Sequence, residues 1–210
     1  MRVISGKLKG RVLKGYNIEG TRPTMDRVKE SLFASIQDYI DDAIVLDLFA
    51  GSGNLGIEAI SNGANICYFV DNNRECIKVI NENINNFNIN NQSVVLNKDY
   101  LKALNDFNIK FDIIFIDPPY KYNIKKELLD IILNNNLLND NGIIVFEYSN
   151  DEEINNNNFR LLKSKKYGDK YISIYKKIWK VIDYQLFFCY YLVIILSFAV
   201  KTRKPLLWKA

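Results

Sequence analysis

The feature that most constrains the fold of this 210-residue chain is an alternation, between residues 44 and 148, of short apolar runs with longer segments of helical spacing. Runs rich in Val and Ile are typical of strands buried on both faces of a parallel sheet, and helices between them cover those faces. The runs are residues 44–49, 66–71, 93–97, 111–117 and 142–148, and the helical segments include 54–61, 73–87 and 125–133. The pattern predicts an α/β fold with a Rossmann-like, mostly parallel sheet and helices on both faces.

Further elements flank this region. Two β-like runs at 159–163 and 171–175 are predicted to form a hairpin that closes the sheet and brings it to seven strands. Residues 2–4 and 11–13 flank a stretch rich in Gly and Lys, and they are predicted to pair as a small N-terminal hairpin.

Residues 24–39 have the spacing of an amphipathic helix. Val28, Leu32, Phe33 and Ile36 fall on one face of that helix, which is therefore expected to pack against the body of the protein. Thr24 follows a proline and is predicted to be the N-cap.

Positive charge is concentrated at the N-terminus. The formal net charge is +4, and residues 1–30 carry eight Lys or Arg against three Asp or Glu. A basic arm on a near-neutral body is expected of a surface that binds phosphates, and it is equally compatible with a solvated charged segment.

The cysteines and the absence of histidine limit the chemistry. Cys67, Cys76 and Cys189 show no CxxC spacing and the chain has no histidine, so a Cys/His zinc site is unsupported and a His-based triad is excluded. We expect no metal, reduced buried thiols and a cytoplasmic location, because the N-terminus has no apolar core of signal-peptide length.

The C-terminal tail differs from the rest of the chain. Residues 186–200 form an unbroken apolar or weakly polar stretch, shorter than the roughly 17–25 residues that span a membrane. Its interpretations are a marginal membrane anchor, a buried extra helix or strand, or a sequence foreign to the ancestral domain that arose by frameshift or read-through. We favour the last.

A glycine-rich segment follows the first strand of the predicted sheet. Gly51, Gly53 and Gly56 let the chain turn sharply from strand to helix and let a ligand approach the backbone. The spacing also satisfies the dinucleotide pattern G-x-G-x-x-G, which is weak alone. Asp71 ends the second strand, where a carboxylate could bind ribose hydroxyls in an enzyme that uses NAD or in one that uses S-adenosylmethionine. Asp47 lies just before the glycines, where it suits a cationic methionine group better than a pyrophosphate.

Asp117, Pro118, Pro119 and Tyr120 follow the strand at 111–117 directly. The prolines remove two backbone donors and stiffen the turn, which leaves the carbonyls of Asp117 and Pro118 free to accept bonds from an exocyclic amine. Tyr120 offers a ring on which a flipped base can stack. Alone, such a segment would more often be a Pro-rich turn with a buried aromatic, but the glycine loop upstream favours the functional interpretation.

The order of these motifs resembles the class I methyltransferases that act on amino groups. The segments 1–10, 21–30, 46–59 and 111–120, and the later Tyr167-Gly168-Asp169, narrow the resemblance to the RsmD family of bacterial 16S ribosomal RNA guanine-N2 methyltransferases. The resemblance extends from residue 1 to about residue 177. Asn54 departs from the small residue common in the family, and the tail has no counterpart.

The resemblance implies S-adenosylmethionine as cofactor and the 2-amino group of guanine 966 in 16S RNA of an assembling small subunit as target. Asp117, Pro118, Pro119 and Tyr120 would hold the target base. The cofactor residues would be Asp47, Gly51 and Gly53 near the methionine part, Asp71 at the ribose and Asp99 at the adenine, with Phe49 as a further cofactor-binding residue. The RNA-facing residues would be Arg2, Lys7, Arg11, Arg22, Thr24 and Arg27, although Arg22 and Arg27 would equally suit pinning the helix to the body.

These expectations give three regions: a basic, RNA-facing N-terminal hairpin and helix at 1–40, an S-adenosylmethionine-binding methyltransferase domain at 41–177 and an apolar tail of unknown role at 178–210. We expect a monomer. The alternatives are an amino-methyltransferase for DNA adenine or protein glutamine, a nicotinamide oxidoreductase, and a non-catalytic RNA-binding or membrane-tethered assembly factor.

Overall fold

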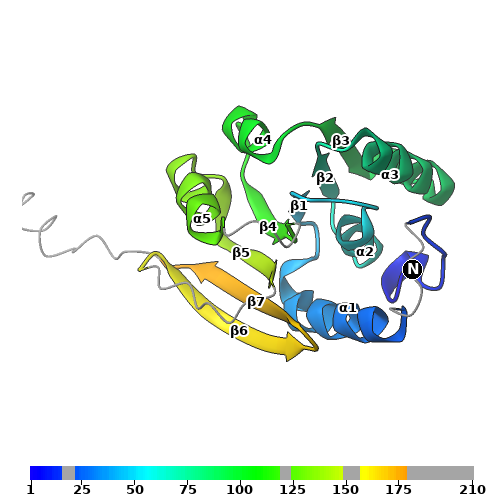
Figure 1. The fold of residues 1–210 in the computed structure, drawn as a ribbon, viewed down its shortest axis with the longest axis horizontal. Helices are drawn as coiled ribbons and strands as arrows, with labels where there is room; N and C mark the ends of the chain where they lie inside the picture. The colour runs from blue at the N-terminus through cyan, green and yellow to red at the C-terminus, as the bar shows by residue number, and fades with distance from the viewer. Residues whose placement is uncertain (16–21, 119–123, 149–156, 179–210) are drawn as a thin grey trace, which may run out of the picture. The chain divides into compact units, whose positions relative to one another are not determined.

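In a computed structural model, which describes residues 1–15, 22–118, 124–148 and 157–178 (only the backbone of 22–25), seven strands form one sheet (Figure 1). Its order is β3-β2-β1-β4-β5-β7-β6. The first five strands are parallel, and β7 runs antiparallel to both β5 and β6. The strands are β1 (Ile44–Asp47), β2 (Ile66–Asp71), β3 (Ser93–Asn97), β4 (Phe111–Ile116), β5 (Leu138–Tyr148), β6 (Phe159–Tyr167) and β7 (Lys170–Lys177). This arrangement confirms the predicted mostly parallel seven-stranded sheet and its closing hairpin.

Helices cover both faces of the sheet (Figure 1). One apolar cluster joins the sheet to α1–α3, and the other joins it to α4 and α5. The helices are α1 (Arg22–Ile36), α2 (Asn54–Ser61), α3 (Arg74–Phe87), α4 (Tyr100–Asp106) and α5 (Lys125–Asn134). Sequence spacing missed α4 because its seven residues are too few to show a helical period.

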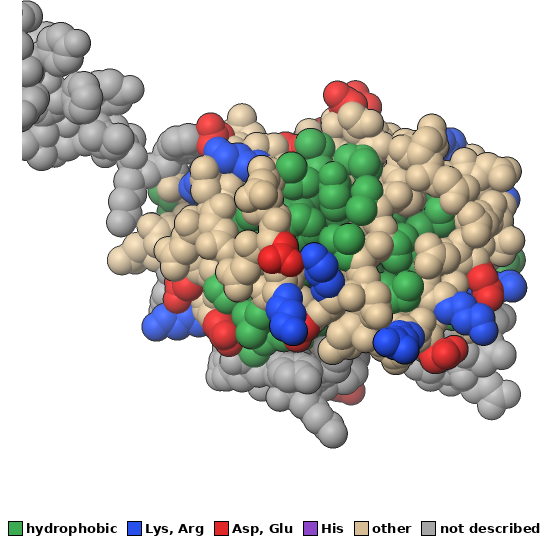
Figure 2. Space-filling model, turned by 90° about the horizontal axis from the view of Figure 1, so that it is seen from above, with side chains coloured by type: hydrophobic (Ala, Val, Ile, Leu, Met, Phe, Trp, Pro, Cys, Tyr) green, Lys and Arg blue, Asp and Glu red, His purple; other side chains and the backbone are tan. Residues whose placement is uncertain are grey.

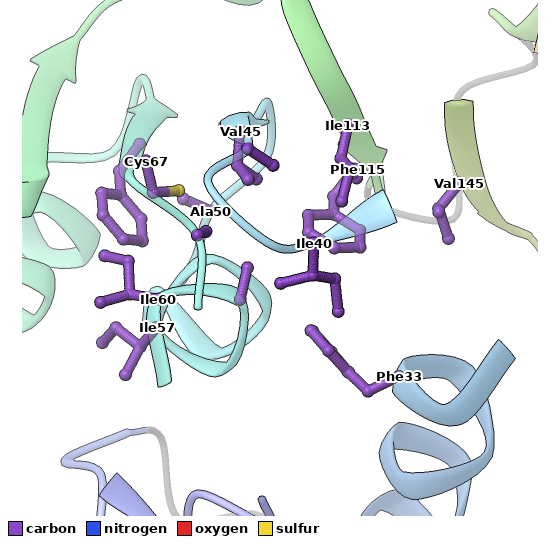
Figure 3. Packing of buried hydrophobic residues seen from close by; sticks show 14 of the residues in the cluster. Phe33, Ile40, Val45, Ala50, Ile57, Ile60, Cys67, Ile113, Phe115 and Val145 are labelled. Carbon is purple, nitrogen blue, oxygen red and sulfur yellow. The ribbon is translucent and has the colours of Figure 1, made fainter. Parts of the chain in front are cut away.

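Successive residues of each central strand alternate between the two clusters, as strand geometry requires. In β4, Ile113 and Phe115 belong to the cluster beneath α1, whereas Ile114 and Ile116 belong to the cluster beneath α5. Figure 3 shows the first cluster, in which Phe33 of α1 approaches Phe115, with ring centroids 5.8 Å apart. Both faces of the central strands are therefore buried, which explains why these strands are almost continuous apolar runs in the sequence.

The apolar face predicted for α1 is confirmed, because Leu32, Phe33 and Ile36 are buried. The predicted N-cap is wrong: the helix begins at Arg22, so Thr24 lies inside it. Pro23 is compatible with the first turn because the N–H groups there have no partner within the helix.

The N-terminal arm, residues 1–15, packs on α2 and α3. Arg2 and Val12 form an antiparallel bridge, which confirms the predicted pairing of these two segments. Glu58 of α2 accepts hydrogen bonds from the backbone N–H groups of Ile4 and Ser5, at 3.0 and 2.8 Å. Arm and sheet domain are thus joined by hydrogen bonds as well as by apolar contact.

The buried cation Lys29 of α1 completes this junction. Its Nζ lies 2.8 Å from Glu58 Oε2 and donates to Arg2 O at 2.7 Å and to Asn54 Oδ1 at 2.8 Å. One ion pair therefore ties together the arm, α1 and α2.

Cys67 and Cys76 are buried, as predicted. Cys189 and the apolar stretch 186–200 lie outside the described residues. Within the part of the chain that the structure describes, no helix is long and apolar enough to cross a membrane. The boundaries proposed at residues 40 and 177 stay a prediction.

Candidate active site

The loop between β1 and α2 is shaped by glycines. Gly51 has φ +54° and Gly53, the N-cap of α2, has φ +77°, conformations that residues with a Cβ rarely adopt. Gly56 is needed for a different reason: a Cβ there would lie 2.3 Å from a ring carbon of Phe69 and 2.5 Å from the sulfur of Cys67. The three glycines together form the turn and bring the start of α2 tightly onto β2.

Asp47 is a buried carboxyl at the end of β1. Its Oδ2 accepts a hydrogen bond from the N–H of Gly56 at 3.0 Å. Its pKa is raised to about 7: burial is the main cause, the hydrogen bond from Gly56 opposes the shift, and the nearby charge of Asp71 adds to it. A cation beside Asp47 would therefore stabilise its ionised form.

Asp71 links the next strand to the same loop. Its Oδ2 accepts from Gly51 N–H at 2.9 Å, and its Oδ1 accepts from Asn73 N–H at 2.8 Å. Each carboxylate oxygen can accept a second bond, so the group can hold the loop and still bind a hydroxyl.

Phe49 and Asp99 mark the neighbouring part of this edge. Asp99 follows β3 and caps α4, where its Oδ1 accepts from Leu101 N–H at 3.0 Å. The ring of Phe49 lies 5.2 Å from that of Tyr100, between centroids. The loop after β1 thus contacts the first residue of α4, beside Asp99.

Asp117 follows β4 at the same edge, since β1 and β4 are parallel neighbours. Its pKa is raised to about 7: burial is the main cause, the charges of Glu147 and Asp47 act in the same direction, and Lys170 opposes them. Pro118 is half-buried. The predicted base-binding residues Pro119 and Tyr120 lie outside the described residues.

The structure therefore brings four sequence-predicted carboxyls, Asp47, Asp71, Asp99 and Asp117, to the carboxyl ends of four adjacent parallel strands. This edge is where open α/β sheets bind ligands. Sequence reasoning missed Glu147 and Lys170. Glu147 lies near the end of the last parallel strand and Lys170 follows Tyr167-Gly168-Asp169, but the sequence does not indicate the antiparallel pairing of β5 with β7 that brings them together.

The cations predicted to face RNA make contacts within the protein. Arg2 pairs with Asp26 at 3.1 Å, and Lys7 donates to Gln92 at 2.7 Å. Arg11 lies over the ring of Phe87, 4.5 Å from its centroid. These contacts attach the arm to the body and leave the predicted RNA contacts untested. Figure 2 shows apolar side chains gathered at the centre of one face and cations interspersed with acids near its margin.

Arg27 is exposed on α1. The side chains of Arg22 and Thr24 lie outside the described part of the chain, so their predicted RNA contacts stay predictions.

Comparisons with known proteins agree with this geometry. A family model described as "Conserved hypothetical protein 95" matches residues 1–176. The Haemophilus influenzae protein named ribosomal RNA small subunit methyltransferase D is 36% identical over 173 residues, covering 80% of this chain and 89% of that protein. The Escherichia coli protein of the same name is 34% identical over 147 residues, covering 70% of this chain and 74% of that protein.

Solved structures show the same fold. An Escherichia coli structure named "Putative methyltransferase yhhF" has a TM-score of 0.75 and 30% identity, and the match covers 84% of this chain and 97% of that chain. The family model and these relatives confirm the resemblance carried by the motifs: the chain belongs to the RsmD family and has the fold of a class I methyltransferase.

Proposed function

We propose that this protein transfers a methyl group from S-adenosylmethionine to the exocyclic N2 amine of a guanine in 16S ribosomal RNA, of the guanine 966 type, in the small subunit or its precursor. The observation that carries the proposal is the pair of carboxyls at the ends of neighbouring parallel strands, buried Asp47 and half-buried Asp117, both with a raised pKa. One lies beside the glycine loop and the other opens the Asp-Pro-Pro-Tyr motif, so cofactor and acceptor would meet between them.

The residues at the end of β1 fit this cofactor. Asp47 is a buried carboxyl whose pKa is raised to about 7, and a sulfonium methionine group would supply the cation that favours its ionised form. A Cβ added at Gly51 would meet no atom within 4 Å, so the turn leaves its backbone open to a ligand. Asp71 has lone pairs left for ribose hydroxyls. Phe49 and Asp99 would lie near the adenine end.

This reaction depends more on the relative positions of the methyl donor and the amine than on activation of either group. When bound, S-adenosylmethionine would supply the methyl group: the guanine N2 lone pair forms the new N–C bond while the S–C bond breaks and its electron pair stays on the sulfur. Before the transfer, Asp117 accepts a hydrogen bond from an N–H group of the amine, which orients the nitrogen lone pair. After the transfer, it takes the proton that the methylated nitrogen releases. Holding two reactants in line can contribute about 7–11 kcal/mol.

The names of relatives support ribosomal RNA as the methyl acceptor. The relatives quoted above are named for ribosomal RNA of the small subunit. A protein named release factor glutamine methyltransferase is 37% identical over only 95 residues, 43% of this chain. A protein acceptor therefore has weaker support than an RNA acceptor.

The acceptor can be tested by incubating the protein with methyl-labelled S-adenosylmethionine and four substrates: unmodified small ribosomal subunits, large subunits, duplex DNA and release factor. We expect label only in RNA of the small subunit. Label in DNA or in release factor, with none in small subunits, would contradict the proposal. Asp117→Ala should bind the cofactor and lose most of the transfer; a wild-type rate would show that Asp117 is not the proton acceptor.

A further inference from the structure

Three carboxyls line one face of the sheet at its carboxyl edge. In β1, β4 and β5, Val45, Phe115 and Val145 belong to the cluster beneath α1. Since side chains alternate along a strand, the residues two positions further on lie on the same face. Those residues are Asp47, Asp117 and Glu147.

A single hairpin brings a lysine to this row. Lys170 begins β7, and Ile172 and Ile174, two and four residues later, belong to the same cluster beneath α1. Lys170 forms an ion pair with Glu147, in which the lysine side chain is 35% exposed and the glutamate 16% exposed. The pair is thus partly withdrawn from water, where charge interactions are stronger than at the surface.

Contacts on the opposite face hold this hairpin in register. Tyr148 of β5 and Tyr171 of β7 are directly paired, and their rings stack with centroids 5.7 Å apart and planes at 11°. The hydroxyls of Tyr148 and Ser173 lie 2.7 Å apart. These contacts fix β7 against β5, so the position of Lys170 beside Glu147 follows from the fold.

We propose that Glu147 and Lys170 are positioning residues that act as a balanced charge pair on Asp117, and that this balance keeps its carboxyl able to take up the proton released by the methylated amine. The inference rests on the proposed function. Among the described residues, the charged groups that act on Asp117 are Glu147 from β5, Lys170 from β7 and Asp47 from β1. Glu147 disfavours the ionised carboxyl and Lys170 favours it, so neither alone would leave the pKa near 7.

The two partners are therefore expected to affect the reaction in opposite directions. Transfer requires ionised Asp117, so the rate should rise with pH through the pKa of this group. Glu147→Gln removes a like charge and leaves Lys170, which lowers that pKa. Lys170→Met removes the cation and leaves Glu147, which raises it.

The experiment is a single-turnover measurement of methyl transfer to unmodified small subunits from pH 5 to 9, at saturating cofactor. We expect the midpoint of the rise to move down by about one pH unit in Glu147→Gln and up by about one unit in Lys170→Met. The double variant should lie between them, and Lys170→Arg should restore the wild-type midpoint. Asp106→Asn, which breaks the exposed pair with Lys98, is the matched control and should leave the midpoint unchanged.

Several results would overturn the inference. Midpoints that stay in place, or that move in the same direction in both variants, would mean that the pair only stabilises the hairpin. Thermal unfolding and cofactor affinity, measured on each variant, identify misfolded protein, and the double variant and Lys170→Arg then carry the test. Absence of transfer by the wild-type protein would instead count against the proposed function.

Discussion

Replacing Lys29 with methionine should be among the most damaging single changes away from the site. The Lys29 side chain is 5% exposed and its partner Glu58 is fully buried, with 2.8 Å between Nζ and Oε2. Methionine fills a similar volume but leaves a buried carboxylate without its cation, and removes the donor to Arg2 O and Asn54 Oδ1. Breaking a buried pair in this way costs about 3–5 kcal/mol. For a domain of this size that corresponds to a fall in Tm of roughly 6–20 °C.

The assay is thermal and urea unfolding followed by circular dichroism. The matched control is Lys14→Met, which breaks the pair of Lys14 with Glu82 at 3.0 Å, where the side chains are 61% and 40% exposed. The control should lose less than about 1 kcal/mol. Adding Glu58→Gln to Lys29→Met should recover part of the loss, since no charge is then left buried. Equal losses for Lys29→Met and the control would refute the reasoning.

Two further predictions concern Asp47 at the end of β1 and Gly56 in the first turn of α2. Because burial holds the pKa of Asp47 at about 7, above its ordinary carboxyl value, its favourable contribution to folding is present below about pH 4 and is lost as pH rises through 7. Urea unfolding at pH 5 and pH 8 should show a smaller pH-dependent loss for Asp47→Asn than for the wild-type protein, with the remainder due to Asp117; identical losses would contradict the assignment. Gly56→Ala should lower the free energy of unfolding by about 1–3 kcal/mol or more, because the added methyl would lie closer to Phe69 and Cys67 than van der Waals contact allows. Wild-type stability in the same urea titration would show that α2 shifts freely on the sheet.

Much of the sheet could be predicted from sequence because its strands are buried on both faces. A strand such as β4 is apolar except for Asp112 near its start, so its position can be predicted without knowing which strands it pairs with. The start of α1 was misplaced because Pro23 is compatible with either side of the helix boundary. The short helix α4 was missed, although Asp99 ahead of it is a capping residue that could have signalled it.

Some residues of the site could likewise be predicted from the sequence, and others could not. Asp47, Asp71 and Asp117 end predicted parallel strands, so their shared edge followed from topology alone. The neighbourhood of Asp117 did not, because Glu147 and Lys170 meet through the antiparallel pairing of β5 with β7, which are not consecutive strands. Likewise, Arg2 and Arg11 looked available to RNA in sequence, but their contacts with Asp26 and Phe87 depend on how the arm packs.

The central claim is that the methyl group reaches N2 of a guanine. The most direct measurement is to methylate unmodified small subunits, digest the 16S RNA to nucleosides and identify the labelled nucleoside by mass spectrometry, with nuclease protection to locate it. The account predicts N2-methylguanosine at one position of the guanine 966 type. Label in another nucleoside, or at many positions, would contradict it.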